Sequence, residues 1–410
     1  MFEEPIQPLL PKLPMRPLTV AWFSFFPLEW LSGMPEAITR LPRLHPASWQ
    51  RVLLTEYETD PNLRLHVVVL RKQFERNLTF ERNGVTFHLL KTPGGLRAPS
   101  LFWLDTVLIR RVLQAVKPDV VHAWGTEQGA ALVAERLGYP RVTTIQGLIS
   151  WYNQVSPPSW HDRVAARLEN YALRRVPLVT TEARFSVQYL RQKFPRLHVE
   201  QVEHASDPAF HAVVRRPQTA PVRFIFVGAF DHRKGGDVML RALDELTGEL
   251  DFELLVIGRP NGPLLESLLA GLSPEFRRRI RFKEHLTHLE VAAELSTATI
   301  MLCASRADVS PNSVKEAAVA GVPVVGTSVG GIPDYIFPGR NGVLCQPGSV
   351  SEFTEAIRAA IRHPQFHRGE VDAATLTQVR AYLSPQLMAK RFLETYQLAL
   401  GTSGPTGTTK

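Results

Sequence analysis

Residues 303–331 read CASRADVSPNSVKEAAVAGVPVVGTSVGG, and this stretch decides the fold. The apolar run just before it, residues 300–302, predicts the end of a buried strand, and a polar loop follows. Ser310 is expected to cap a helix whose first residue is Pro311, and Gly321 marks the end of that helix. A run of valines then begins the next buried strand. The stretch therefore predicts a strand–loop–helix–strand unit of an α/β sheet, where ligands bind at the ends of strands.

Two acidic residues mark this unit. Asp308 lies on the predicted loop and Glu316 in the second turn of the helix, with seven residues between them. The helix N-terminus offers free N–H groups and partial positive charge, and a carboxylate beside it can accept hydrogen bonds from sugar hydroxyls. The alternative is a solvated helix residue and an ordinary loop residue.

The ordered pattern S-x-x-D-x-x-P-N-S-V-x-E-A-x-x-x-G-x-P-V-V-G-T-x-x-G-G resembles the donor-site motif of the retaining glycosyltransferases of family four, which have the GT-B fold. That family usually carries Glu at both acidic positions, whereas this chain has Asp308 at the first. The resemblance covers residues 220–400 well and residues 18–212 loosely.

The resemblance implies an α/β protein of the GT-B class, with two doubly wound Rossmann-like domains facing each other across a cleft. The expected parts are an acceptor-side domain at 1–212, a linker at 213–221, a nucleotide-sugar-binding domain at 222–386, a helix at 387–400 that packs back on the first domain, and a disordered tail at 401–410.

The implied function is transfer of a sugar from a nucleotide-diphosphate donor to a carbohydrate, lipid-linked or small acceptor, with retained configuration and front-face displacement. Neither a metal nor another cofactor is expected. Asp308 is then expected to face the sugar and Glu316 the ribose. The resemblance also assigns these residues to the donor: Gly228, Ser310, Asn312, Ser313, Gly330 and Gly331.

A basic pair follows the first strand of the second domain, in the segment VRFIFVGAFDHRKGG. Arg233 and Lys234 stand beside glycines at a strand end, which suits a clamp for phosphate. In the family an arginine normally follows the first glycine directly, but here that position is Ala229. The clamp would therefore depend on Arg233 and Lys234, and the alternative is an exposed basic turn.

The acceptor side is expected on the first domain. Many family members have a histidine near the donor sugar where this chain has Gln146, and the segment at 150–160, SWYNQVSPPSW, is predicted to be a loop that carries Trp151 and Tyr152. Gly33, on a long loop after the first strand, is placed on the same side. Exposed aromatic residues can stack on sugars or sit at a membrane interface, whereas the alternative is that the tryptophans of this loop are buried and anchor it.

Composition bears on the possible partners and on the location of the protein. The formal net charge is +8, but the basic residues are scattered, so a nucleic-acid partner is not expected. Two cysteines and no apolar run of about 18 residues fit a cytoplasmic protein. Peripheral contact with the inner face of a membrane stays open, since Arg110 and Arg111 could attract anionic headgroups.

Three other functions remain open at this stage. A sugar-nucleotide epimerase of the same fold would share the phosphate and ribose contacts, and transfer to an acceptor would separate the two. A catalytically silent binding protein would show no donor hydrolysis. A dinucleotide dehydrogenase should show G-x-G-x-x-G after an early strand, and the chain has none.

Overall fold

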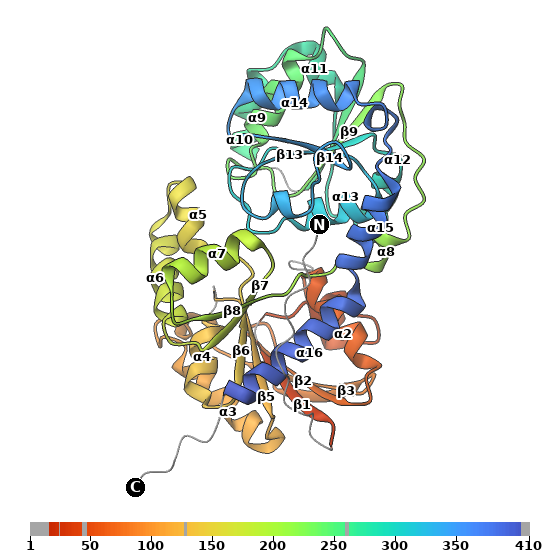
Figure 1. Cartoon of the computed structure of the whole chain (residues 1–410). Coiled ribbons are helices and arrows are strands. Elements are labelled where there is room, and N and C mark those ends of the chain that lie inside the picture. The colour runs from red at the N-terminus through yellow and green to blue at the C-terminus, as the bar shows by residue number, and fades with distance from the viewer. Residues whose placement is uncertain (1–15, 24, 43–46, 127–128, 259–261, 403–410) are drawn as a thin grey trace.

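The computed structural model describes residues 16–23, 25–42, 47–126, 129–258 and 262–402. Two α/β domains are stacked, each built on its own sheet (Figure 1). The first sheet has eight strands in the order β3-β4-β2-β1-β5-β6-β7-β8, of which β3 runs antiparallel to β4. They are β1 (Leu18–Phe23), β2 (Leu63–Arg71), β3 (Leu78–Arg82), β4 (Val85–Lys91), β5 (Val120–Trp124), β6 (Arg141–Thr144), β7 (Leu178–Thr181) and β8 (His198–Gln201).

The second sheet has six parallel strands in the order β11-β10-β9-β12-β13-β14. The order along the chain reverses between β9 and β12, and ligands of such sheets bind in the crevice at that point. The strands are β9 (Val222–Val227), β10 (Phe252–Ile257), β11 (Ile280–Lys283), β12 (Ile300–Cys303), β13 (Val324–Thr327) and β14 (Gly342–Cys345). Two mainly parallel sheets, each covered by helices, confirm the predicted fold class.

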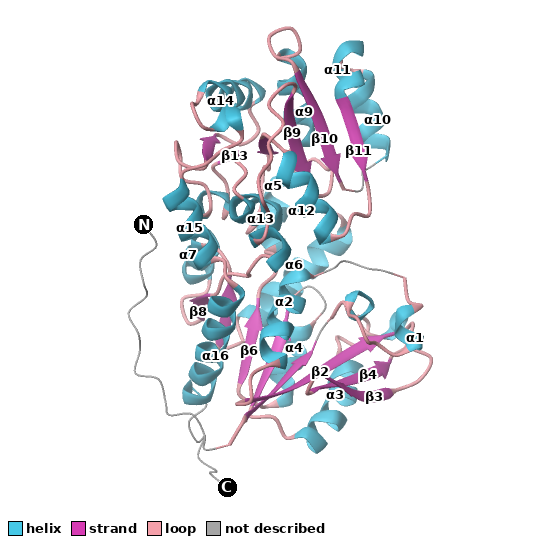
Figure 2. Cartoon of the chain, turned by 90° about the vertical axis from the view of Figure 1, so that its right-hand side faces the viewer, coloured by secondary structure: helices cyan, strands magenta, loops and turns pink. Residues whose placement is uncertain are grey.

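Helices cover the faces of both sheets (Figure 2). Those of the first half of the chain are η1 (Leu28–Trp30), α1 (Glu36–Thr39), α2 (Ser48–Glu58), η2 (Gly94–Leu96), α3 (Trp103–Val116), α4 (Ala130–Leu137), α5 (Ile149–Val155), α6 (Trp160–Leu173), α7 (Arg184–Lys193) and α8 (Pro208–His211). Those of the second half are α9 (Gly236–Glu245), α10 (Gly262–Ala270), α11 (Pro274–Arg279), α12 (His288–Thr297), α13 (Asn312–Ala320), η3 (Ile332–Asp334), α14 (Val350–Arg362), η4 (Phe366–Arg368), α15 (Ala373–Tyr382) and α16 (Pro385–Thr402).

Helix α13 is buried along almost its whole length. From Val314 to Ala320 each residue is buried, because the helix lies between the sheet and its neighbours α8, α12 and α15. Three small residues, Ala317, Ala318 and Ala320, let these elements approach closely. Gly321 ends the helix in the left-handed region at φ 77°, as predicted. The motif helix is therefore held rigidly in the second domain.

Helix α16 returns to the first domain and completes its core. Phe392 and Tyr396 are fully buried among residues of β1 and β2. The hydroxyl of Tyr396 accepts a hydrogen bond from Nε1 of Trp22 at 2.9 Å and lies 2.8 Å from Nδ1 of His122. Residues 401 and 402, expected in a tail, finish α16, while residues 403–410 lie outside the described part of the chain.

The segment at 213–221 contains no helix or strand and runs along the second domain. The backbone N–H of Arg216 donates to the carbonyl of Ser296, and that of Gln218 to the carbonyl of Thr297, both at 2.8 Å. The side chain of Phe210, just before the segment, is packed in the core of the second domain. The linker and domain limits given by the sequence stay predictions.

Some local predictions are wrong. The segment at 150–160 is not a loop, because α5 covers its first half and Trp160 begins α6. Ser159 and Asp162 form a capping box at the start of α6, a signal that the prediction missed. Ser310 does not cap α13, since Pro311 is the N-cap and the hydroxyl of Ser310 bonds across the domain interface instead. The short strands β3 and β8 were also missed.

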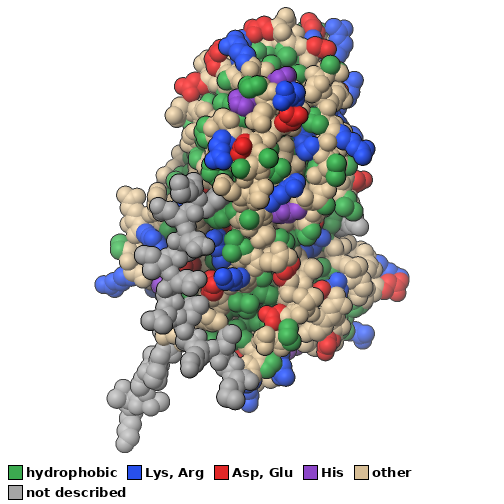
Figure 3. All heavy atoms as spheres, turned by 45° about the vertical axis from the view of Figure 1, so that its right-hand side comes forward, with side chains coloured by type: hydrophobic (Ala, Val, Ile, Leu, Met, Phe, Trp, Pro, Cys, Tyr) green, Lys and Arg blue, Asp and Glu red, His purple; other side chains and the backbone are tan. Residues whose placement is uncertain are grey.

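Basic and acidic side chains are interspersed on the face of the molecule shown in Figure 3. This agrees with the scattered basic residues of the sequence. Within the described ranges, no helix is both long enough and apolar enough to cross a membrane.

Candidate functional site

The loops after β9 and β12 pack together at the crevice of the second sheet. The backbone N–H of Arg306 donates to the carbonyl of Arg233 at 2.7 Å. Gly235 has φ 69°, and a Cβ there would lie 1.9 Å from the carbonyl oxygen of Ala304, so this approach requires glycine. Two segments far apart in sequence thus form one surface where the strand order reverses.

Asp308 pairs with the basic residues predicted to bind diphosphate. Its carboxylate is almost fully buried and forms an ion pair with Nζ of Lys234. Nη1 of Arg233 lies 3.9 Å from Oδ2 of Asp308 and donates to the carbonyl of Ala307 at 3.0 Å. The structure therefore brings together all three residues that the sequence suggested as catalytic.

Glu316 is a buried carboxylate that lacks hydrogen bonds. Its side chain is on α13, the residue is 9% exposed, and no hydrogen bond to it occurs within the described chain. Burial raises the pKa of Glu316, an effect that His288 and Lys315 partly offset. A buried carboxylate without donors is costly, so this position favours a ligand that supplies hydroxyl groups.

The other donor-side residues lie around the same crevice. Gly228 ends β9 with φ 143°, and Asn312 and Ser313 are half-buried in the first turn of α13. A Cβ on Gly330 would lie 1.7 Å from the carbonyl oxygen of Asp308, and one on Gly331 would lie 2.2 Å from that of Val309. Close backbone packing alone therefore explains both glycines of this pair.

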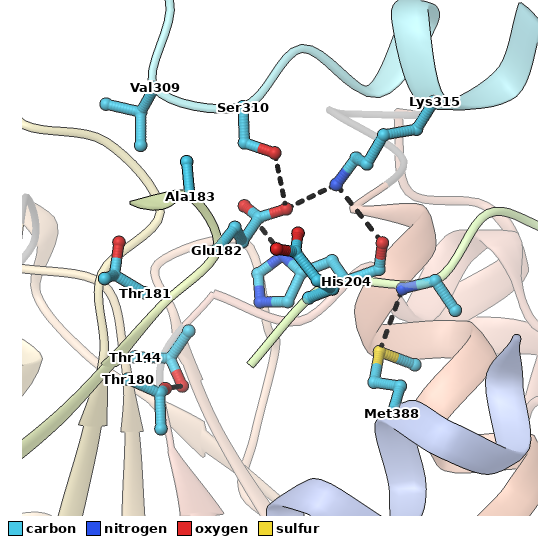
Figure 4. A network of polar contacts seen from close by, with 12 residues as sticks. Thr144, Thr180, Thr181, Glu182, Ala183, His204, Val309, Ser310, Lys315 and Met388 are labelled. Carbon is cyan, nitrogen blue, oxygen red and sulfur yellow. Dashed lines mark hydrogen bonds and ion pairs between the residues drawn. The ribbon is translucent and has the colours of Figure 1, made fainter. Parts of the chain in front are cut away.

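A buried polar network joins the two domains beside this crevice (Figure 4). Glu182, which follows β7, forms an ion pair with Nζ of Lys315 on α13, and Nδ1 of His204 lies 3.0 Å from its Oε1. The Ser310 hydroxyl donates to the same carboxylate at 3.1 Å. Burial alone would raise the pKa of Glu182, but His204 and Lys315 beside it lower that pKa to about 2. Glu182 is thus a buried anion that holds α13.

Glu203 is a second buried carboxyl in this interface, with a different protonation behaviour. Tyr335 donates to its Oε2 at 2.6 Å, and Tyr382 donates to its Oε1 at 2.7 Å. Burial raises the pKa of Glu203 to about 7, although Lys315 and these hydrogen bonds partly offset it. The group therefore titrates near neutral pH within the domain interface.

The residues predicted for the acceptor side are not brought together. Trp151 is 9% exposed, and its ring packs against Gly330, while the Tyr152 hydroxyl accepts a hydrogen bond from the N–H of Val309 at 3.3 Å. Gln146 is half-buried after β6. Gly33 lies near Arg82 of the outermost strand β3, in the other half of the sheet. Trp151 and Tyr152 thus support the loop that carries Asp308.

The interdomain network was not predicted from the sequence. Glu182 stands directly after a predicted strand, at the end where ligands bind, and Lys315 stands at a buried position beside Glu316. The sequence did contain a signal for the pairing. Both positions are expected to be buried and both carry a charge, and buried charges need a partner. The separation of 133 residues between them concealed the pairing.

Two family models match the chain. The model described as Glycosyltransferase Family 4 matches residues 60–209, and the one described as Glycosyl transferases group 1 matches residues 221–363. The first match lies in the first domain and the second covers the crevice with Asp308 and Glu316.

Two curated relatives are similar to this chain in sequence. The chain is 26% identical over 253 residues to a glycogen synthase of Mycobacterium tuberculosis, in an alignment that covers 60% of this chain and 61% of the relative. It is 28% identical over 332 residues to a D-inositol 3-phosphate glycosyltransferase of a Nocardioides species, covering 72% of this chain and 71% of the relative. The chain thus spans less than two thirds of the glycogen synthase.

Solved structures share the fold. The sucrose-phosphate synthase of Thermosynechococcus elongatus superposes with a TM-score of 0.75 at 15% identity, covering 94% of this chain and 100% of that one. HepE of Anabaena, in complex with UDP and glucose, superposes with a TM-score of 0.67 at 14% identity, covering 92% of this chain and 99% of that one. At these identities the likeness concerns the fold alone.

The protonation of Glu203 predicts a pH effect on stability. Its folded pKa of about 7 lies above the ordinary value of 4.5, so the folded protein binds more protons between these values. As pH rises through this window, Glu203 should therefore cost up to about 3 kcal/mol of stability, and Glu203→Gln should remove that loss. Urea unfolding of both proteins across the window measures it. The quantity to compare is the difference in unfolding free energy between the two proteins. Burial lowers the pKa of His204, so its titration raises stability with pH in both proteins and cancels in that difference. Parallel curves would contradict the assignment.

Proposed function

The chain belongs to the group 1 glycosyltransferases, and from this premise we propose that it transfers a sugar from a nucleotide-diphosphate sugar to an acceptor hydroxyl. The observation that carries the proposal is the buried carboxylate of Glu316, which lacks hydrogen bonds within the described chain. Ribose offers two neighbouring hydroxyl groups, and a carboxylate can accept from both. This interaction would offset the cost of burying the charge.

The diphosphate is proposed to bind between the basic pair and the N-terminus of α13. Lys234 and Arg233 lie on the loop after β9, and the first N–H groups of α13 have no helical acceptor. Lys234 is paired with Asp308 in this structure, so a bound diphosphate would compete for its ammonium group. The departing nucleoside diphosphate carries the charge that develops in the reaction, and these donors would stabilise it.

The stereochemistry is proposed to be retaining, with attack from the face that the leaving group vacates. In this mechanism the leaving diphosphate can take the proton of the acceptor, so the protein need not supply a general base. Positioning and charge stabilisation then supply the catalysis. Asp308 is proposed to contact the transferred sugar.

The names of relatives do not select an acceptor. One relative is named a glycogen synthase and another a D-inositol 3-phosphate glycosyltransferase, and these names indicate acceptors of different size. A carbohydrate or lipid-linked acceptor is therefore proposed only as a class.

A peripheral membrane contact is a further part of the proposal, supported by α6. Trp160 is 66% exposed and Tyr171 is 47% exposed on this helix, which lies at the outer side of the first domain (Figure 1). Arg163 and Arg167 are exposed between them. Interfacial aromatic residues with interleaved arginines suit a surface of anionic lipid.

The first test of the proposal is Glu316→Gln. Loss of a charge-assisted hydrogen bond should weaken UDP binding about tenfold or more in calorimetry. The variant should be at least as stable as the parent, because burial raises the pKa of this carboxyl and its charged form is unfavourable at neutral pH. Glu355→Gln on the exposed face of α14 is the matched control. Unchanged UDP affinity in Glu316→Gln would refute the ribose contact.

The second test is Lys234→Ala, measured as release of nucleoside diphosphate from the donor. Loss of an electrostatic stabiliser of this kind lowers turnover about 100- to 1,000-fold. Lys283→Ala, in the same domain but outside the crevice, should retain full turnover. A Lys234→Ala protein with more than a third of the parental turnover would exclude a catalytic role. Ala229→Arg in that background should restore part of the activity.

The third test concerns the membrane. Arg167→Ala should weaken binding to vesicles that contain phosphatidylserine about fivefold, since each basic residue near an anionic surface contributes about 1 kcal/mol. Trp160→Ala should weaken binding further, and Arg368→Ala on the second domain should have no effect. Co-sedimentation measures this. Equal binding by all three variants, or no binding by the parent, would remove the membrane contact from the proposal.

A further inference from the structure

A cavity of about 270 Å³ opens at the carboxyl ends of β1, β2 and β4 in the first domain. Its walls include Phe25 after β1, Arg71 at the end of β2 and Thr92 after β4. In the other half of this sheet, the same edge carries Glu182 and Glu203, which contact the second domain. The cavity therefore lies on the edge of the first domain that carries its contacts with the donor-binding domain.

Two buried polar groups of the cavity wall lack hydrogen bonds. Thr92 is 2% exposed, and its hydroxyl has no partner in the described chain. Arg71 is 6% exposed, and its Nε–H has none either, although Nη1 donates to Oε2 of Glu29 at 2.9 Å. Two larger cavities, one between α2 and α16 and one beside α9, have no such atom in their walls. Leaving a buried hydroxyl or guanidinium N–H unpaired is unfavourable, so these groups point to a ligand.

The charge of the cavity wall is positive. Arg71, Lys72 and Arg97 belong to it, and no acidic residue does. Arg71 is paired with Glu29 and Arg97 with Asp105, so the uncompensated charge is that of Lys72, which has no ion pair within the described ranges. A Cβ on Gly94 would lie 2.8 Å from Cδ of Lys72, so the glycine allows the lysine chain to lie against the wall. The unpaired charge of Lys72 thus belongs to the same cavity wall as the two buried donors.

The size of the cavity limits its occupant. Pockets for drug-sized ligands measure roughly 300–1,000 Å³, so this one suits a single ring or a smaller group. Phe25 supplies an apolar surface, and its ring lies 4.8 Å from the guanidinium carbon of Arg71. The walls thus offer hydrogen-bond donors, positive charge and one aromatic face to a small polar ligand.

We propose that this cavity binds the anionic group, a phosphate or a carboxylate, of a small polyhydroxylated acceptor. The assignment rests on the proposed transfer function and replaces the aromatic segment at 150–160 as the main acceptor contact. Lys72 supplies the charge, and Thr92 and the Nε–H of Arg71 donate to the anionic oxygens. Specificity for a charged acceptor then depends on residues at the carboxyl ends of two strands, β2 and β4.

The test uses glucose 6-phosphate, glucuronate and glucose as probes in calorimetry, with UDP at saturating concentration to fill the donor site. The two anionic probes should bind the parent protein at least tenfold more tightly than glucose does. The stronger of the two then identifies phosphate or carboxylate as the preferred group. Measurements belong at low ionic strength, where charge contacts are least screened.

Two variants locate the binding. Lys72→Ala should weaken the anionic probes about tenfold, and Thr92→Val, which keeps the shape, should weaken them severalfold without loss of stability. UDP affinity should be unchanged in both. Lys390→Ala, an exposed lysine of α16, is the matched control for charge.

Three results would overturn the inference: equal affinity for glucose and the anionic probes, no binding of an anionic probe at millimolar concentration, or full binding in both Lys72→Ala and Thr92→Val. Normal UDP binding in the same experiments would leave the proposed function intact. Loss of UDP binding in the parent would count against that function instead.

Discussion

The arrangement of the two domains depends on the buried ion pair between Glu182 and Lys315. Lys315 is 1% exposed and also donates to the carbonyl of His204 at 3.2 Å, so both partners are removed from water. Removing one partner of such a pair typically costs about 3–5 kcal/mol, because the other charge stays buried and uncompensated. Lys315 and Glu316 are neighbours on α13: Lys315 contacts the first domain, and His288 is close enough to Glu316 to lower its pKa. The pair that fixes the domains thus also fixes the carboxylate proposed to bind ribose.

Charge balance explains how the crevice stays stable with no ligand bound. Asp308 compensates Lys234, and Glu182 compensates Lys315, so each buried or half-buried cation has an anion beside it. Only the first of these pairs lies where a diphosphate would bind, and its lysine can exchange one anion for another. Binding therefore need not uncover a charge in the domain interface.

The unit from β12 to β13 was predictable because its signals are local: a buried apolar run, a small-residue helix and a glycine end. The prediction failed where a distant partner decides the structure. Ser310 has the chemistry of an N-cap, yet its hydroxyl bonds to Glu182 across the interface and to Tyr335 in its own domain. The segment at 150–160 failed for a different reason, since the capping box of Ser159 was a local signal that the prediction missed. The basic pair and both motif carboxylates were predictable, whereas the buried network was not.

The acceptor side shows why an aromatic motif can mislead. Trp151 is apolar and lies in a short helix against Gly330, so burial against the second domain satisfies it completely. Burial alone does not satisfy Thr92, because its hydroxyl has no partner. A valine of the same shape would fill its place without an unpaired hydroxyl. No local pattern marks it, because the cavity forms only when the ends of β1, β2 and β4 come together. Thr92 in the first domain has a buried hydroxyl without a partner in the described chain, and Glu316 in the second is a buried residue whose carboxylate has no hydrogen bond there, so a ligand can supply hydrogen bonds to both. The proposed transfer needs two substrates, and such groups occur in both domains of the chain.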